Sequence, residues 1–194
     1  MTVEDVMKKI RRDSSFYRNK GGVTVSGGDP LLYYKFVEEL LKTCQEEGIN
    51  TVLESELCVP LRNLEAVASY VDLFMTDLKI VDEQKHIEAT GLSNKLAIQN
   101  LRYIAKNYPG KIFLRVPIIP GFTDADDNIH AIGAFCAENT ISRVNILPYH
   151  KLGSTKHERL GGEYPMPEVD VPDDEQMRHI ADIFLSHGVE CKIN

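Results

Sequence analysis

Residues that can hold a small polar ligand lie in or directly after five short segments with the apolar character of buried strands. In chain order they are Gly27, Gly28, Asp29, Glu54, Ser55, Asp77, Lys79, Arg115 and His150. In parallel α/β folds, ligands bind at the carboxyl ends of the strands. Because the predicted strands carry these residues within them, at their ends or just after them, we expect the set to meet at one rim.

The chemistry of this set suits one kind of ligand. Paired glycines leave the backbone free for close approach, and carboxylates accept hydrogen bonds from an ammonium group or from ribose hydroxyls. Lys79 and Arg115 can pair with a carboxylate, and His150 can hydrogen-bond a purine edge or shuttle a proton. An amino acid joined to a nucleoside would use all of these groups, and S-adenosylmethionine (SAM) is such a molecule.

Alternating strand and helix patterns would position these residues. Apolar runs predict strands at 21–26, 50–54, 72–78, 111–118, 143–147 and 189–193. Periodicity and caps predict helices at about 2–12 with Thr2 as N-cap, 34–47, onward from Pro60, 93–107 with Ser93 as N-cap, 126–138 and 173–187. Repeated strand–helix units indicate an α/β fold with a mainly parallel sheet, and we predict one domain over 1–194. Only 150–172 reads as a long irregular stretch.

Four sequence blocks occur here in the order and approximate spacing of a known family. They are residues 21–32 (GGVTVSGGDPLL), 74–79 (FMTDLK), 117–122 (PIIPGF) and 146–153 (ILPYHKLG). Together they resemble the activating proteins of glycyl-radical enzymes, a radical SAM family whose best-known member is the pyruvate formate-lyase activating enzyme. The resemblance covers the whole chain and implies a partial (β/α)6 TIM-like barrel of the radical SAM type.

The resemblance implies an oxidoreductase that uses SAM and a 4Fe–4S cluster. In such proteins the cluster delivers an electron that cleaves SAM, and the resulting 5′-deoxyadenosyl radical takes hydrogen from a glycine of a partner enzyme. The partner would be pyruvate formate-lyase or a relative, and a flavodoxin or ferredoxin would supply the electron.

The resemblance also implies roles for individual residues. Gly27, Gly28 and Asp29 would hold the amino group of SAM, mainly through their backbone, and Glu54 would help to bind that ammonium. The remaining contacts would come from Asp77 and Lys79 to the ribose and the methionine carboxylate, from Arg115 along the methionine side, and from His150 near the adenine. A monovalent cation site is implied at Glu54, Ser55, Met75 and Asp77.

This sequence departs from the family pattern in three places. Asp29 stands where the family usually has glutamate, and residues 54–60 (ESELCVP) look more like relatives that activate other glycyl-radical enzymes. The Cys-x3-Cys-x2-Cys segment that ligates the cluster is absent. We therefore expect the chain to be the C-terminal part of a longer protein, to lack the first barrel strand, to hold no catalytic residue and to be inactive alone.

Composition excludes several classes of function. The net charge of −7 argues against nucleic-acid or anionic-membrane partners, which need a basic face. We find neither an apolar run of about 18 residues nor a signal-peptide pattern, so we expect a cytoplasmic protein. The four cysteines lie far apart, which predicts free thiols rather than a metal site or a disulfide framework.

Two other functions fit parts of the sequence. A barrel enzyme of different chemistry, such as an aldolase, could use Lys79 as a Schiff-base amine if burial lowered its pKa. A barrel that had lost its cluster could serve as an interaction module that binds a protein partner. A pure docking domain would not need five ligand-ready strand ends, so the rim of polar residues favours the SAM-binding hypothesis.

Overall fold

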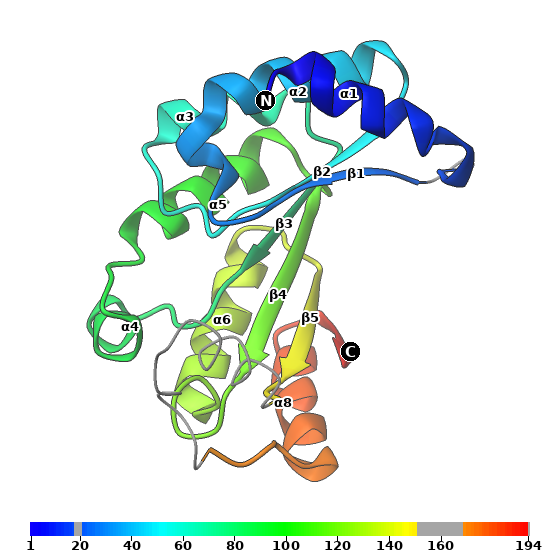
Figure 1. The fold of residues 1–194 in the computed structure, drawn as a ribbon. Helices are drawn as coiled ribbons and strands as arrows, with labels where there is room; N and C mark the ends of the chain where they lie inside the picture. The colour runs from blue at the N-terminus through cyan, green and yellow to red at the C-terminus, as the bar shows by residue number, and fades with distance from the viewer. Residues whose placement is uncertain (18–20, 151–168, 194) are drawn as a thin grey trace. The chain divides into compact units, whose positions relative to one another are not determined.

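A computed structural model describes residues 1–17, 21–150 and 169–193 (Figure 1). Within them, six strands form a sheet in the order β1-β2-β3-β4-β5-β6. The strands are β1 (Gly22–Val25), β2 (Asn50–Glu54), β3 (Leu73–Asp77), β4 (Ile112–Ile118), β5 (Arg143–Pro148) and β6 (Glu190–Ile193). The β1–β2, β2–β3, β4–β5 and β5–β6 pairs are parallel.

Helices alternate with these strands. They are α1 (Val3–Arg12), α2 (Tyr34–Glu46), α3 (Leu61–Ala68), α4 (Glu83–Thr90), α5 (Lys95–Asn107), α6 (Asp126–Glu138) and α8 (Asp174–Ser186), with short 3-10 helices η1 (Ser14–Phe16) and η2 (Pro30–Tyr33). The predicted α/β fold with a parallel sheet is confirmed, and each predicted strand and helix is present within a few residues of its expected bounds.

Two details of the predicted helices are wrong. Helix α4 was not expected, and Ser93 does not cap α5: the N-cap is Asn94, which makes no side-chain cap bond. The Ser93 hydroxyl instead donates to Glu83 at 2.7 Å, at the start of α4.

The chain divides into two compact units. The first comprises Met1–Thr76 and Asn94–Phe113, and the second comprises Asp77–Ser93 and Leu114–Asn194. Each unit contains a part of the β3–β4 ladder. In the first, the Phe74 N–H donates to Lys111 O at 2.7 Å; in the second, the Leu78 N–H donates to Arg115 O at 2.9 Å. The prediction of one domain stays a prediction.

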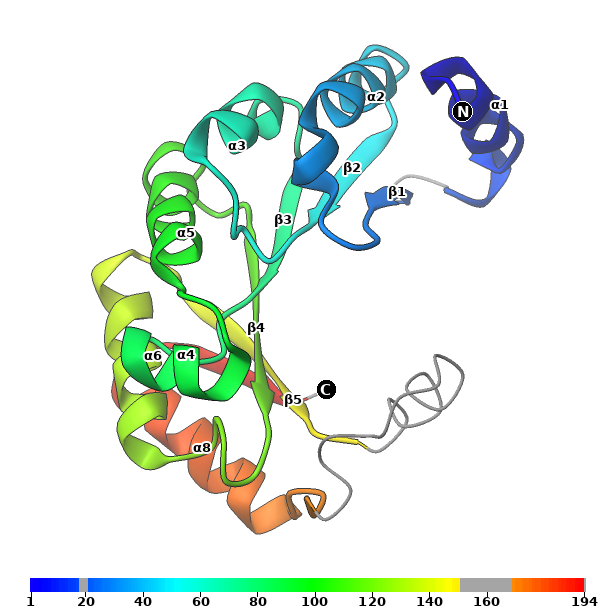
Figure 2. The ribbon, with the colours of Figure 1, turned by 60° about the vertical axis from the view of Figure 1, so that its left-hand side comes forward.

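The core of the first unit lies between its strands and helices α2, α3 and α5. Alternation along β2 and β3 buries every second side chain, and Leu53 and Phe74 are each only 1% exposed. Figure 2 shows α3 and α5 on one side of β2 and β3. Because the other alternate residues of these strands are only half-buried, the opposite face stays accessible for polar groups such as Glu54.

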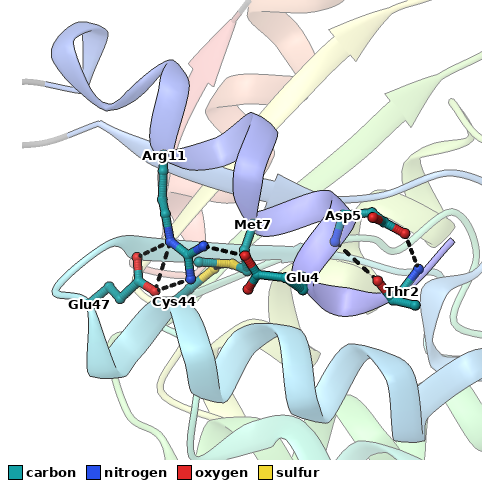
Figure 3. A network of polar contacts seen from close by, with 7 residues as sticks. All are labelled: Thr2, Glu4, Asp5, Met7, Arg11, Cys44 and Glu47. Carbon is teal, nitrogen blue, oxygen red and sulfur yellow. Dashed lines mark hydrogen bonds and ion pairs between the residues drawn. The ribbon is translucent and has the colours of Figure 1, made fainter.

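Helix α1 begins with the predicted cap. The Asp5 N–H donates to Thr2 Oγ1 at 3.2 Å, and the Thr2 N–H donates to the Asp5 carboxylate at 3.0 Å, which is a capping box (Figure 3). These bonds from the Thr2 backbone and side chain lower the pKa of Asp5. Met7 and Ile10 then face inward, so α1 packs on α2 through its apolar side.

Polar and sulfur contacts fix the position of α1 on α2 (Figure 3). Arg11 donates to both carboxylate oxygens of Glu47, with a shortest distance of 2.6 Å, and also to Glu4 at 2.9 Å. The bonds from Arg11 lower the pKa of Glu47. Beneath this exposed cluster, Cys44 Sγ lies 3.7 Å from Met7 Sδ in the buried core.

The second unit has its own core, where α6 and α8 pack against each other and α8 covers β5 and β6 (Figure 1). Ile132, Val144 and Phe184 are fully buried there. Gly133 allows the close approach of the two helices, because a Cβ at this position would lie 2.6 Å from the His187 ring. No helix in the described parts of the chain has the length and apolar character that crossing a membrane requires.

The four cysteines differ sharply in accessibility, and this predicts selective chemical labelling. Burial raises the pKa of Cys136 to about 12 and that of Cys191 to about 11, and it also raises the pKa of Cys44. Cys58 is exposed. At pH 8 the three thiols with a raised pKa stay protonated, and a protonated thiol does not react with iodoacetamide.

We expect iodoacetamide to modify Cys58 first, and mass spectrometry of timed samples checks this. A Cys58→Ser variant serves as control, and equal labelling of Cys136 in the native protein would contradict the burial described here.

Candidate functional site

A cluster of one carboxylate and two cations in the second unit joins the end of β3 to the middle of β4. Arg115 Nε donates to Asp77 Oδ1 at 2.6 Å, and Lys79 Nζ lies 3.7 Å from Asp77 Oδ2. The three side chains are only 13% to 26% exposed. The cluster carries one net positive charge in a partly desolvated place, so it can attract an anionic group such as a carboxylate.

Helix α6 holds the backbone that carries Lys79. The Asn128 side chain is buried, and its amide donates to Lys79 O at 2.9 Å and to Thr123 O at 2.8 Å. Thr123 in turn donates through its hydroxyl to Pro117 O at 2.7 Å. The segments that follow β3 and β4 are therefore joined to each other by one asparagine.

The glycine turn of the first unit follows β1. Gly27 has φ +98° and Gly28 has φ +58°, a backbone region that favours glycine. A Cβ at either position would meet nothing within 4 Å, so the turn is open to a ligand. After it, Asp29 Oδ1 accepts from the Leu31 N–H at 3.0 Å and caps η2.

The loop that follows β2 lies against this turn. Ser55 is buried, and its hydroxyl is 3.0 Å from each Asp29 carboxylate oxygen. Ser55 Oγ also accepts from the Leu57 N–H at 2.9 Å. Leu57 has φ +59°, which is uncommon for a residue with a side chain. The buried Asn100 amide donates to the carbonyls on both sides of Cys58, Leu57 O and Val59 O, at 2.8 Å each.

The structure therefore brings the predicted site residues together in two sets, one in each unit. Asp29 and Ser55 are in contact in the first unit, where Glu54 is half-buried at the end of β2. Asp77, Lys79 and Arg115 are in contact in the second. His150 is exposed and follows the buried Tyr149, whose N–H donates to Ile118 O at 2.9 Å. The predicted irregular stretch after His150, including the end of the fourth motif block, lies mostly outside the described residues.

The groups predicted to bind a monovalent cation already have protein partners. Ser55 Oγ contacts Asp29 and Leu57, the Met75 carbonyl accepts from the Ser55 N–H at 3.1 Å, and Asp77 contacts Arg115. The cation site stays a prediction. In the described ranges, no group of three or more His, Cys, Asp or Glu side chains could hold a metal ion. The residues present therefore do not fit an iron–sulfur cluster.

Each of the two sets, taken by itself, offers groups that are complementary to a part of SAM. The open glycine turn offers backbone groups without side-chain obstruction, and the Asp77 cluster offers both an acceptor and cationic donors. An amino acid has an ammonium and a carboxylate, and a ribose has hydroxyls, so each kind of ligand group has a complementary protein group.

Sequence reasoning missed the buried asparagines and a pocket. Asn63, Asn100 and Asn128 are each at most 8% exposed and donate to carbonyls in the segments that follow strands, with Asn63 bonded to Leu31 O at 3.0 Å. Their signal is an asparagine directly before a buried apolar residue on the inner face of a helix. A pocket of about 400 Å³ is lined by Ile80, Lys85, Glu88, Ala89, Gly121 and Phe122, half of which belong to the unpredicted α4.

Comparison with known proteins defines the class. The sequence model of the Radical SAM superfamily matches residues 1–131, more than half of the chain. The chain belongs to the Radical SAM superfamily.

Two individual relatives are similar to this chain along almost its whole length. The indoleacetate decarboxylase activating enzyme of Tractidigestivibacter scatoligenes is 59% identical over 194 residues, which are 100% of this chain and 62% of that protein. The 4-hydroxyphenylacetate decarboxylase activating enzyme of Clostridioides difficile (strain 630) is 38% identical over 193 residues, or 99% of this chain and 61% of that protein. The chain thus spans somewhat over three-fifths of the curated relatives it matches.

A solved structure supports the same relationship. A domain of the pyruvate-formate lyase-activating enzyme from Bacteroides vulgatus ATCC 8482 matches with a TM-score of 0.74 and 26% identity. The match covers 89% of this chain and 98% of that domain.

Proposed function

We propose that this chain is the SAM-binding portion of an activating enzyme that generates a glycyl radical in a partner enzyme. The observation that carries the proposal is the Asp77 cluster at the end of β3 and the middle of β4, in a chain that belongs to the Radical SAM superfamily. Lys79 and Arg115 would hold the methionine carboxylate, and Asp77 would accept from the ribose. The glycine turn would offer backbone groups to the ammonium, and Glu54 would add a negative charge nearby. His150 would lie near the adenine.

The chain's residues would bind and orient SAM, while the cluster would be held elsewhere in the longer protein. SAM and a 4Fe–4S cluster together supply the one-electron chemistry that removes a hydrogen atom from a glycine. Lys79 and Arg115 are suited to orientation because Asp77 holds both cations in place. A flavodoxin or ferredoxin would supply the electron, and the reaction would take place in the cytoplasm, where four free cysteines are expected.

The partner we propose is a glycyl-radical decarboxylase of an arylacetate. The support is the 59% identity with the indoleacetate decarboxylase activating enzyme along the whole chain. The 4-hydroxyphenylacetate decarboxylase activating enzyme, at 38%, acts on a partner named for a similar substrate. The aldolase alternative finds little support, because Lys79 is paired with Asp77 and the chain belongs to a radical SAM family.

The activity test uses the full-length protein, reconstituted with iron and sulfide and reduced under anaerobic conditions. With SAM and indoleacetate decarboxylase, we expect the electron paramagnetic resonance doublet of a glycyl radical, and with pyruvate formate-lyase we expect little or none. SAM cleavage is measured in parallel as 5′-deoxyadenosine. Cleavage without a radical on the decarboxylase would reject the proposed partner, and absence of SAM cleavage with an intact cluster would reject the proposed activity.

A further inference from the structure

The glycine turn needs an external anchor. Gly27 and Gly28 adopt positive φ, and a Cβ at either position would meet nothing within 4 Å, so the turn itself restrains little. The last β1 residue before it, Val25, is paired with Leu53 of β2. Directly after the turn, the Asp29 side chain contacts Ser55, which belongs to the loop that follows β2.

We propose that Asp29 and Ser55 form a positioning pair that holds the glycine turn in its ligand-binding shape. The inference deepens the proposed function, because it takes SAM as the ligand of the turn. Both ends of the turn are attached to β2 or to the residue that follows it. Before the turn, Val25 pairs with Leu53 of β2, and after the turn, Asp29 bonds to Ser55. Leu53 and Ser55 are two residues apart, roughly 7 Å along an extended backbone. The turn must therefore close over a short, defined span.

Ser55 is suited to act as the fixed side of this pair. It is buried, and its N–H donates to Met75 O of β3 at 3.1 Å, which continues the β2–β3 ladder. Its hydroxyl lies within 3.0 Å of both Asp29 oxygens and accepts from the Leu57 N–H. A hydroxyl has one proton, so it donates to the Asp29 carboxylate and uses a lone pair for Leu57.

The pair gives the Asp29 carboxylate a role within the protein. Its oxygens already accept from the Leu31 N–H and the Ser55 hydroxyl, so the carboxylate acts on the ligand through the turn it holds. Aspartate at this place is short enough to close these local bonds, since the Leu31 contact spans only two residues. Substitutions on either side of the pair should therefore have similar consequences for the turn.

The test measures the turn directly in the 194-residue chain, with or without SAM. In Ser55→Ala and in Asp29→Ala, we expect the amide order parameters of Gly27 and Gly28 to fall from about 0.85 to below about 0.6. SAM affinity, by isothermal titration calorimetry, should fall about tenfold in each variant, and the double variant should lose little more because the two residues act together. Ser55→Thr, which keeps the hydroxyl, should restore both measurements. Ser69→Ala, an exposed serine in the same unit, is the matched control.

Two other results would contradict different parts of this argument. If the Asp29 carboxylate bound the SAM ammonium itself, Asp29→Asn would lose as much affinity as Asp29→Ala, Ser55→Ala would lose little, and the order parameters would not change. That pattern would overturn the positioning pair. If the wild-type chain bound no SAM at all, the proposed function would be in question, but the order parameters of the free chain would still decide whether the pair holds the turn.

Discussion

Replacing Asp77 with alanine is expected to weaken SAM binding by about 30-fold. Asp77 lies between Arg115 and Lys79, at 2.6 Å and 3.7 Å, and its side chain is only 13% exposed. A hydrogen bond to a charged group contributes about 2 kcal/mol when it is partly shielded from water, which corresponds to this factor. Without the carboxylate the two cations repel each other, and the guanidinium loses the bond that orients it. Isothermal titration calorimetry on the 194-residue chain measures the change in affinity.

Two further variants separate orientation from charge. Asp77→Asn keeps an acceptor for Arg115 Nε, so we expect a smaller loss of affinity than in Asp77→Ala. Lys79→Ala removes a cation that would pair with the methionine carboxylate, and it should also weaken binding. Thermal unfolding of each variant shows whether the fold persists. If SAM affinity were unchanged in both Asp77→Ala and Lys79→Ala, our placement of the site would be incorrect.

An alanine at position 22 is expected to displace β1 from the sheet. A Cβ on Gly22 would overlap the backbone oxygen of Asn50, its partner in the β1–β2 ladder. Backbone atoms cannot move aside as a flexible side chain can, so the strands must separate. β1 has only four residues and stands at one end of the strand order, where its ladder partner is β2. We expect Gly22→Ala to lower the free energy of unfolding by about 3 kcal/mol, the upper end for overpacking.

Urea unfolding monitored by circular dichroism measures this loss. Thr24→Ala is the matched control, because Thr24 is exposed on the same strand and its replacement should cost less than about 1 kcal/mol. SAM affinity should also fall in Gly22→Ala, since the glycine turn begins just after β1. Equal stability of the two variants would mean that the close approach of Gly22 to Asn50 is absent in solution.

The periodicity of apolar residues along the sequence predicted the strands and helices that bury one face in the core. β2 and α6 have the bounds expected for them, because apolar residues at the right period alternate there with polar ones. Helix α4 escaped this reasoning because none of its residues is buried. Its ends carried the only signals, an Asp82 side chain that accepts from the Lys85 N–H and a Gly91 in the left-handed conformation. Ser93 was predicted to be the N-cap of α5, but its hydroxyl donates to Glu83 of α4.

The candidate site was predicted as a set of residues, and the particular partners of Arg115 and Ser55 within it were not. A strand position shows which residues reach the rim, but it does not show that Arg115 bonds Asp77 or that Ser55 bonds Asp29. Those bonds depend on the register between strands, which is determined by packing of the whole sheet. The supporting asparagines were missed for the same reason, since the carbonyls that they bind belong to distant segments.

Those asparagines constrain the construction of chimeras with related proteins. Asn128 belongs to α6, but the carbonyls it binds follow β3 and β4. A grafted β3 loop with a different backbone path would move the carbonyl of residue 79 out of reach of the buried Asn128 amide, and the lost hydrogen bond would cost about 1 to 3 kcal/mol. Asn100 of α5 is related in the same way to the loop around Cys58. The natural unit of exchange is therefore a loop together with the helix that holds it, although the two are far apart in the sequence.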